Sequence, residues 1–345
     1  MKIAFLNIYN GIVERGSEVF VDEIAGRFSG SYDVDVFQIG KKTDKKYTVN
    51  QITGIPYIKN QSLLYDFFLL LFSLRCFSYL LKNKYDWIVP INGGSQVIVC
   101  RVVRFVTHSK ILICGHAGIG RDDKINIQFG KPDIFVALSQ KALSWVKEKF
   151  PFQKTVYIPN GVDLSQFNPS LKPIDTGLRL PVILCVSALL PYKRIGLLID
   201  AVSGIVNTSL LLIGDGPLYE NLYNQAQSKI PGRFKIIKKV SHNDITRYYK
   251  TAQVFSLPSK ESEAFGLVYL EALASNIPVV APDDQSRREI VRNAGLYTDV
   301  EDPVKYSDVL IKALKNDWEN KPRRQAEKFS WDTISSEYKK IIEKV

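Results

Sequence analysis

Residues 254–271 read VFSLPSKESEAFGLVYLE, and this stretch decides the fold class. A short apolar run at 254–257 is followed by a polar loop, and an apolar segment of helical length begins after Gly266. Strand, loop and helix in this order are typical of a βαβ unit, whose strands run parallel. The stretch therefore predicts a parallel α/β domain in the second half of the chain.

The same alternation continues in both directions from this stretch. Further runs with strand character lie in the second half at 182–187, 209–213, 234–238, 278–281 and 296–298. In the first half they lie at 2–8, 34–39, 87–89, 111–114, 134–137 and 155–158. Segments of helical length separate them, so we predict two doubly wound domains, one after the other.

A stretch rich in proline and glycine divides the two series of elements. It contains Pro159, Gly161, Pro169, Pro173 and Gly177, and such a composition is typical of a linker. The chain has 345 residues. At ~100–200 residues per domain, this length also indicates two domains. We place the N-terminal domain at 1–165 and the C-terminal domain at 166–329.

The chain is basic, with a formal net charge of +11. Residues 1–165 hold 21 Lys and Arg against 14 Asp and Glu, so most of the excess lies in the first half. A basic protein favours acidic partners such as nucleic acid, anionic lipid or a phosphorylated substrate. The positive charges are scattered rather than gathered in a stripe with aromatic residues, which disfavours nucleic acid. A solvated basic surface is the alternative.

The spacing of cysteine and histidine disfavours the common metal sites. The four cysteines form no CxxC pair and lie in apolar stretches, so we expect buried, reduced thiols in a reducing compartment. They are Cys76, Cys100, Cys114 and Cys185. The three histidines include no pair at i, i+4. We therefore expect no zinc site.

The most apolar segment is 63–81, LLYDFFLLLFSLRCFSYLL. Its 19 residues would barely span a bilayer, and Asp66 and Arg75 would be costly at the bilayer centre. We interpret it as a buried core helix. Contact with an anionic membrane surface, helped by Lys82 and Lys84, is the alternative. The N-terminal apolar run is too short for a signal peptide, so we expect a cytoplasmic protein, or one held peripherally on the inner membrane face.

The loop that ends at Gly266 has the chemistry of an anion site. Free N–H groups and the positive end of the dipole at a helix N-terminus favour a diphosphate. Glu263, just before the helix, can accept hydrogen bonds from sugar hydroxyls. Glu271 would lie ~12 Å further along if the intervening residues were all helical, so the two carboxylates would hold opposite ends of one extended ligand. An ordinary acid at a helix start and a solvated Glu271 are the alternative.

Polar residues also follow the strands of the first half. Gly11 and Gly16 allow the backbone to approach a ligand closely, and Arg15 could bind a phosphate. Ser17 could cap the helix that follows. We place Asn92, in a flexible Asn-Gly-Gly loop, on the acceptor side.

A second polar group follows the strand at 111–114. His116 lies directly beyond this strand. Asp122 and Asp123 come shortly after it and could bind an acceptor hydroxyl or cap a helix.

Five motifs, in this order along the chain, resemble glycosyltransferase family 4, whose members are retaining enzymes of the GT-B fold. They are 158–163 (IPNGVD), 186–194 (VSALLPYKR), 212–217 (LIGDGP), the E-x7-E spacing of Glu263 and Glu271, and 329–331 (FSW) with the helix after it. The likeness is specific over residues 155–345 and weaker over 1–150.

The resemblance implies two Rossmann-like domains that face each other across a cleft, the first binding the acceptor and the second binding the nucleotide sugar. It also implies that the tail, 330–345, crosses back to the N-terminal domain. The expected reaction moves a hexosyl group, with retention of configuration, from a UDP- or GDP-sugar to a hydroxyl of a glycan, polysaccharide or lipid-linked saccharide. No cofactor and no metal are expected, because no DxD triplet lies in a suitable place and Asp283-Asp284 is not assigned a metal.

The resemblance further implies roles for individual residues. Glu263, Lys193 and His116 are the expected catalytic residues: Glu263 holds the sugar, Lys193 neutralises the leaving diphosphate, and a neutral His116 donates to a sugar hydroxyl. The expected donor site also contains Gly11, Arg15, Gly16, Arg194, Gly214, Asp215, Gly216, Ala264, Phe265, Gly266, Leu267 and Glu271. The acceptor side is expected to contain Asn92, Asp122 and Asp123.

One position departs from the family pattern. The family usually has an arginine five residues before the lysine of the 186–194 motif, where this chain has Ala188. Arg194, or Arg15, would then have to supply the second positive charge of the diphosphate clamp. Other functions stay open at this point: a related sugar phosphorylase or nucleotide-sugar epimerase, a basic nucleic-acid-binding protein, or an inactive relative.

Overall fold

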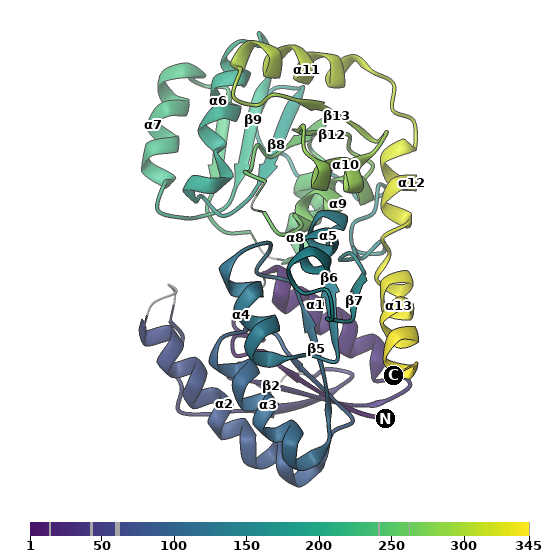
Figure 1. Cartoon of the computed structure of the whole chain (residues 1–345). Coiled ribbons are helices and arrows are strands. Elements are labelled where there is room, and N and C mark those ends of the chain that lie inside the picture. Colours follow the sequence, from purple (N-terminus) through teal and green to yellow (C-terminus); the bar gives the residue numbers. More distant parts are fainter. Residues whose placement is uncertain (14, 42–43, 59–62, 241, 262, 345) are drawn as a thin grey trace. The chain divides into compact units, whose positions relative to one another are not determined.

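The computed structural model describes residues 1–13, 15–41, 44–58, 63–240, 242–261 and 263–344, which form two compact units (Figure 1). Unit 1 comprises Met1–Asn160 and Trp331–Val345, and unit 2 comprises Gly161–Ser330. Ser262, which belongs to the loop before Gly266, lies outside the described residues.

Unit 1 has, in the described residues, a seven-stranded parallel sheet with the strand order β3-β2-β1-β4-β5-β6-β7. The strands are β1 (Lys2–Leu6), β2 (Asp33–Gln38), β3 (Thr48–Gln51), β4 (Trp87–Pro90), β5 (Lys110–Cys114), β6 (Ile134–Ala137) and β7 (Thr155–Tyr157). The order reverses between β1 and β4. In open parallel sheets, a ligand binds at such a switch point, beyond the carboxyl ends of the strands.

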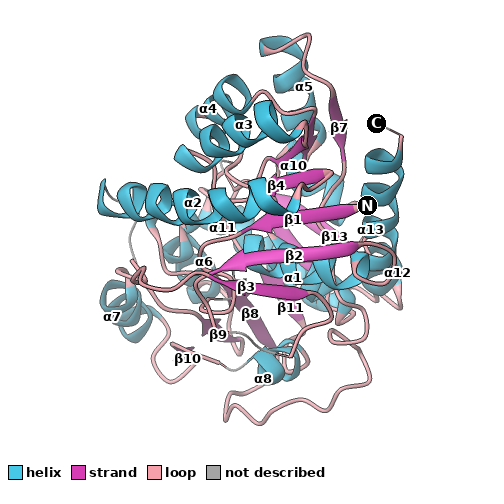
Figure 2. Cartoon of the chain, turned by 90° about the horizontal axis from the view of Figure 1, so that it is seen from below, coloured by secondary structure: helices cyan, strands magenta, loops and turns pink. Residues whose placement is uncertain are grey.

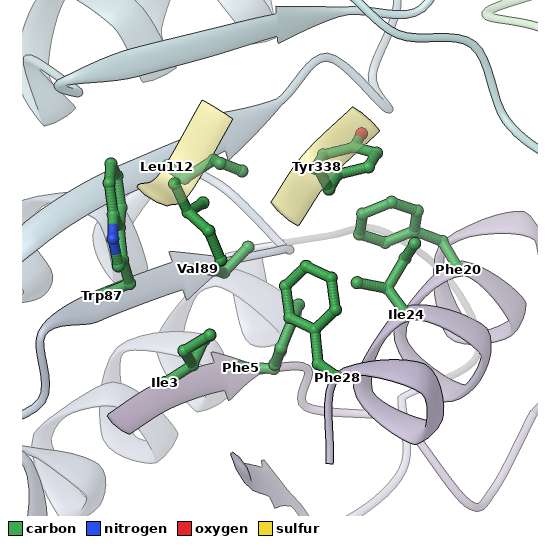
Figure 3. Close-up of a pocket in the computed structure, with 10 residues that line it drawn as sticks. Ile3, Phe5, Phe20, Ile24, Phe28, Trp87, Val89, Leu112 and Tyr338 are labelled. Atoms are coloured by element: carbon green, nitrogen blue, oxygen red, sulfur yellow. The ribbon is translucent and has the colours of Figure 1, made fainter. Parts of the chain in front are cut away.

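Helices cover both faces of this sheet. They are α1 (Gly16–Phe28), α2 (Leu63–Asn83), α3 (Ser95–Thr107), α4 (Arg121–Gly130), α5 (Gln140–Lys149) and α13 (Trp331–Glu343). Side chains alternate along β1: Ala4 and Leu6 join the core beneath α2 and α3, whereas Ile3 and Phe5 point toward α1 and α13. Figure 2 shows α2, α3 and α4 beside one another, and Figure 3 shows Tyr338 of α13 near Phe20 of α1, in the cluster that Ile3 and Phe5 also line. Both faces are therefore buried.

Unit 2 repeats this plan. Its described residues form a six-stranded parallel sheet with the order β10-β9-β8-β11-β12-β13. The strands are β8 (Val182–Val186), β9 (Ser209–Ile213), β10 (Phe234–Ile237), β11 (Val254–Ser256), β12 (Val279–Pro282) and β13 (Gly295–Thr298). The helices are η1 (Pro191–Lys193), α6 (Ile195–Ser203), α7 (Tyr219–Lys229), α8 (His242–Tyr249), α9 (Leu267–Ala274), α10 (Gln285–Val291), α11 (Pro303–Lys315) and α12 (Lys321–Glu327). Here the order reverses between β8 and β11.

The interpretation of 63–81 as a buried core helix is wrong. Only one side of α2 packs into the core, through residues such as Phe72 and Cys76. The opposite side faces outward, and Leu63 and Phe67 are 89% and 58% exposed. α2 lies on the outside of the sheet, so none of the described residues of unit 1 covers its second side.

The edge strand β3 was not expected from the sequence, and α4 is only weakly marked in it. β3 is a polar edge strand in which only Val49 is buried. The buried side of α4 has helical spacing, at positions 123, 126, 127 and 130, but Asp123 and Asn126 occupy two of these positions. Apolar periodicity therefore marks this helix weakly, because two of its four buried positions are polar.

Candidate active site

Lys193 and Glu263 meet at the switch point of unit 2. Lys193 ends the 3₁₀ turn η1 after β8, and Glu263 lies in the loop after β11, the neighbouring strand. The Lys193 Nζ forms an ion pair with Glu263 Oε2. Lys193 is buried and Glu263 is half-buried, so water screens the pair less than it screens a surface pair. Two residues that are predicted to be catalytic and lie 70 positions apart are therefore direct partners.

Gly266 allows the loop after β11 to turn into α9. Its φ is +87°, and a Cβ at this position would lie 2.8 Å from the Tyr269 ring. Because α9 begins only at Leu267, Glu263 is not helical and the expected helical spacing to Glu271 does not hold. Ala264 is half-buried and Phe265 is buried. The helix start expected to bind diphosphate is present, while diphosphate binding itself stays a prediction.

Glu271 is held in place by Tyr249 of α8. The Tyr249 hydroxyl donates to Glu271 Oε2 at 2.6 Å, and the Tyr249 side chain is fully buried. Burial, followed by the adjacent Glu271 carboxylate, raises the pKa of Tyr249. The phenol thus stays protonated and keeps donating to Glu271. No signal in the sequence indicated this tyrosine.

The Gly214-Asp215-Gly216 turn packs against the backbone of the loop after β8. A Cβ on Gly214 would lie 1.8 Å from the Ser187 carbonyl oxygen, and one on Gly216 would lie 2.5 Å from that of Leu189. The Leu189 N–H donates to the Asp215 carbonyl at 3.0 Å. Both glycines are therefore needed to bring this turn against the loop that carries Lys193.

Arg194 is engaged with the loop after β11. Its Nε donates to the Pro258 carbonyl at 2.8 Å, and one of its terminal nitrogens pairs with Glu301 at 2.7 Å. Ala188, where the family usually has arginine, is exposed. Arg194 thus fastens two loops together, and its role as a substitute for the missing clamp charge stays a prediction.

Arg287 is a site residue that the sequence analysis missed. Its side chain is fully buried and donates to the Ser259 hydroxyl at 2.7 Å and to the Lys260 carbonyl at 2.8 Å. It also pairs with Asp284 at 3.0 Å. Arg287 therefore anchors the segment directly before Glu263. A lone arginine in a helical stretch gives no sign of burial in the sequence.

The described residues contain no group of three or more His, Cys, Asp or Glu that could hold a metal ion. Asp283 pairs with Arg288 at 2.6 Å, and Asp284 caps α10. The four cysteines are free and buried. Burial raises the pKa of Cys100, Cys114 and Cys185 to about 12, so these thiols stay protonated.

In unit 1, His116 follows β5 at the carboxyl edge of the sheet. Its ring lies 4.7 Å from that of Phe20, and its Nε2 is buried without a hydrogen-bond partner in the described part of the chain. Burial lowers the pKa of His116 to about 4, so the imidazole is neutral at pH 7. This protonation state is the one that its expected role requires.

Asp122 and Asp123 lie in the first turn of α4, where only Asp123 is buried. Burial, and then the Asp122 carboxylate, raise the pKa of Asp123 to about 8. Its Oδ1 has no hydrogen-bond partner among the described residues. Neither residue caps the helix, since the N-cap position is Gly120.

The loop after β1 places Arg15 beside Glu18. Arg15 Nε lies 3.6 Å from Glu18 Oε2, and Glu18 is buried although it was not predicted as a site residue. Desolvation raises the pKa of Glu18, and Arg15 opposes this shift. The expectation that Ser17 caps α1 is wrong: Arg15 is the N-cap residue, and Ser17 donates to Glu18 from within the helix. Gly16 is the first residue of that helix.

Gly11 and Asn92 shape the backbone on either side of the unit 1 switch point. Gly11 has a φ of +75°, and a Cβ on it would lie 2.8 Å from Gln38 Nε2. The Asn92 Oδ1 accepts the Ile8 N–H at 2.9 Å, which ties the loop after β4 to the end of β1. The acceptor role of Asn92 stays a prediction.

A model of the glycosyl transferases group 1 family matches residues 172–329. This segment, less than half of the chain, is similar to the group 1 glycosyl transferases. A similar protein, the GDP-mannose-dependent monoacylated alpha-(1-6)-phosphatidylinositol monomannoside mannosyltransferase of Corynebacterium glutamicum, is 29% identical over 202 residues. The match covers 53% of this chain and 53% of that protein, so it spans about half the length of each.

Solved structures of glycosyltransferases share the fold along the whole chain. Sucrose-phosphate synthase of Thermosynechococcus elongatus gives a TM-score of 0.84 at 20% identity, covering 99% of this chain and 98% of that one. Anabaena Alr3699/HepE in complex with UDP and glucose gives a TM-score of 0.80 at 17% identity, covering both chains fully. The predicted GT-B fold is confirmed.

Proposed function

We propose that the protein moves a hexosyl group from a nucleotide diphosphate sugar to an acceptor hydroxyl. One observation carries this proposal: within the segment that matches the family, Lys193 is paired with Glu263 just before the start of α9. A cation, a carboxylate and free helix N–H groups suit the diphosphate and the sugar hydroxyls of a single donor. The Corynebacterium relative is named for GDP-mannose and the Anabaena structure contains UDP and glucose, so GDP- and UDP-hexoses are the first donors to test.

In the proposed reaction, the bond between the anomeric carbon and the diphosphate oxygen breaks while the acceptor oxygen attacks from the same side. The acceptor proton passes to an oxygen of the leaving diphosphate, and configuration is retained. Lys193 neutralises the charge that develops on the diphosphate, and Glu263 accepts hydrogen bonds from the sugar. Because Lys193 and Glu263 are paired with each other, binding of the donor has to replace part of this ion pair by contacts with the diphosphate and the sugar. The scheme uses no metal ion.

Further residues of unit 2 are proposed to bind the nucleotide. Glu271, held by Tyr249, would accept hydrogen bonds from the ribose diol. The glycine turn at 214–216 would contact the nucleotide, since it packs on the loop that carries Lys193. The diphosphate would bind the N–H groups at the start of α9.

Unit 1 is proposed to bind the acceptor. His116 and Asp123 each bury a polar atom that has no partner in the described residues, as expected where a hydroxyl-bearing ligand completes the hydrogen bonding. A neutral His116 would donate to a hydroxyl or accept from one, and a protonated Asp123 would donate. Arg15, with Gly11 and Gly16, would contact donor phosphates.

The acceptor is proposed to be a saccharide, with a lipid-linked saccharide as the favoured class. The Corynebacterium relative is named for a phosphatidylinositol monomannoside, which is a glycolipid. An enzyme with such an acceptor would act in the cytoplasm at the inner membrane face. A phosphorylase or an epimerase is the alternative. With either of these enzymes, adding an acceptor would not cause release of a nucleotide diphosphate.

Release of nucleotide diphosphate from a panel of UDP-, GDP- and ADP-hexoses tests the proposal. Lys193→Ala and Glu263→Gln are each expected to lower turnover about 100-fold or more, because each removes a group that stabilises the transition state. The matched control is Lys229→Ala, which removes a lysine of the same unit that pairs with Asp200 at 2.6 Å on the surface. This control should turn over like the parent. If no sugar nucleotide is bound or consumed, or if both site variants match the parent, the proposal is wrong.

A further inference from the structure

The outward sides of α2 and α3 are apolar. Leu63, Phe67 and Leu74 of α2 and Val102, Phe105 and Val106 of α3 are all exposed, and Phe105 is 71% exposed. These six residues are called the α2–α3 face below. In soluble proteins, a large contiguous exposed apolar patch marks a surface that binds a partner or a membrane.

The α2–α3 face is one surface because of how the two helices are built and packed. Leu63, Phe67 and Leu74 follow one another at i, i+4 and i+11, and the α3 residues at i, i+3 and i+4, so each set lies along one side of its helix. The two helices pack against each other on the same side of the sheet (Figure 1). Their inner sides are largely apolar as well, through residues such as Phe72 and Val103. Both helices are thus apolar on two opposite sides, far beyond what packing on one sheet requires.

The charge around the α2–α3 face is positive. Together α2 and α3 carry four Lys and Arg (Arg75, Lys82, Arg101 and Arg104) against one acid, Asp66. Arg104 pairs with Asp133 at 2.8 Å. Lys82 and Lys84 are exposed at the end of α2. Long basic side chains beside an apolar face suit a bilayer that contains acidic lipids, because its acyl chains are apolar and its headgroups are anionic.

α2 is long and apolar enough to cross a membrane by length and composition, alone among the described helices. Spanning would, however, pull Leu69, Phe72 and Leu80 out of the core of unit 1, where each is almost fully buried. The burial of one side of α2 therefore fits a helix that lies along a membrane surface.

We propose that the α2–α3 face docks on the surface of an anionic bilayer, with its apolar side chains at the headgroup–acyl boundary and its lysines near the lipid phosphates. This inference deepens the proposed function, since it names the surface that would present a lipid-linked acceptor. It rests on the proposed function only for the reason why the protein would bind a membrane. The binding itself requires no turnover.

Co-sedimentation of the full chain with vesicles tests the inference. We expect pelleting with phosphatidylcholine–phosphatidylglycerol vesicles, weaker pelleting with phosphatidylcholine alone, and release by salt. The double variant Phe67→Ser/Phe105→Ser should bind at least about tenfold more weakly, because two aromatic side chains no longer leave water. Lys82→Gln/Lys84→Asn should bind phosphatidylcholine vesicles like the parent and lose part of the additional binding to the anionic vesicles.

Val206→Ser/Val304→Ser is the matched control, because it removes two apolar side chains that are 82% and 68% exposed in unit 2. It should pellet like the parent. Because all the substituted residues are exposed, thermal unfolding is expected to be unchanged in each variant, which separates lost binding from lost folding.

The inference is overturned if the parent stays in the supernatant with anionic vesicles, or if the control loses as much binding as the double variant. It is also overturned if light scattering shows a dimer that Phe67→Ser/Phe105→Ser converts to a monomer, since the face would then bind a second copy. Nucleotide diphosphate release without vesicles separates the two proposals. A variant that no longer binds lipid but still consumes donor supports the docking face, whereas lipid binding without donor turnover overturns only the proposed function.

Discussion

At the scale of single residues, Asp123 and His116 are the buried groups of unit 1 whose titration bears on the proposed acceptor site. The pKa of Asp123 is raised from 3.8 to about 8, so its stabilising contribution is complete below pH 3.8 and is lost as the pH rises toward 8. The pKa of His116 is lowered from 6.5 to about 4, so its contribution is complete above pH 6.5 and is lost as the pH falls toward 4. The two effects oppose each other between pH 4 and 6.5. Of these two groups, only Asp123 still changes the free energy of unfolding above pH 6.5.

This arrangement predicts that the free energy of unfolding falls between pH 6.5 and 8.5 through Asp123. In Asp123→Asn the fall should shrink by about 1–2 kcal/mol, because the side chain can no longer ionise in the core. Urea unfolding at the two pH values measures the difference. Asp44→Asn, at an exposed aspartate of the same unit, should keep the parent's pH dependence. An identical pH dependence in Asp123→Asn and the parent would mean that the Asp123 carboxyl is already ionised at pH 6.5.

At the scale of elements, the start of α9 depends on Gly266. An alanine there would have to adopt a left-handed φ and would also push against the Tyr269 ring, so we expect Gly266→Ala to cost about 1–3 kcal/mol of stability and to weaken nucleotide binding. Gly232→Ala is the matched control, because Gly232 has a φ of +69° but open space where a Cβ would stand. Chemical denaturation and calorimetric titration with UDP and GDP measure both effects. Equal losses in the two variants would show that the Tyr269 contact is unimportant.

Most of the elements could be predicted from the sequence, because alternating apolar runs and helical segments of ordinary length mark them. The exceptions have physical causes. β3 was not predicted because it is a polar edge strand. α4 is weakly marked because Asp123 and Asn126 occupy two of its four buried positions. The exposure of α2 could not be predicted, because the sequence does not show whether another element covers an apolar side chain such as Phe67.

The candidate site was predictable to the extent that motifs marked it. Lys193 and Glu263 were both expected, but their direct pairing follows from the positions of β8 and β11 in the sheet. Tyr249 and Arg287, which hold Glu271 and the loop before Glu263, belong to no motif. Their roles arise from burial and distance, which only the folded chain defines.

At the scale of the whole molecule, the last helix of the chain completes the first unit. α13 follows unit 2 in sequence, yet it packs with α1 on the sheet of unit 1. Tyr338 is buried there (Figure 3), and its hydroxyl lies 3.4 Å from the Cys114 sulfur. We expect Tyr338→Ala to lower the free energy of unfolding by about 3–5 kcal/mol, because a large buried ring is removed. Phe152→Ala, at a fully exposed ring of the same unit, should change it by less than about 0.5 kcal/mol.

The position of this loss within the molecule is the sharper test. Since α13 belongs to unit 1, hydrogen exchange in Tyr338→Ala should accelerate at the amides of β1 and β5 and stay unchanged at those of β8 and β12. Equal acceleration in both sheets would contradict the assignment of the tail to unit 1. Acceleration confined to α13 itself would show that the helix adds little to the core. Loss in the first sheet alone would mean that the stability of unit 1 depends on α13.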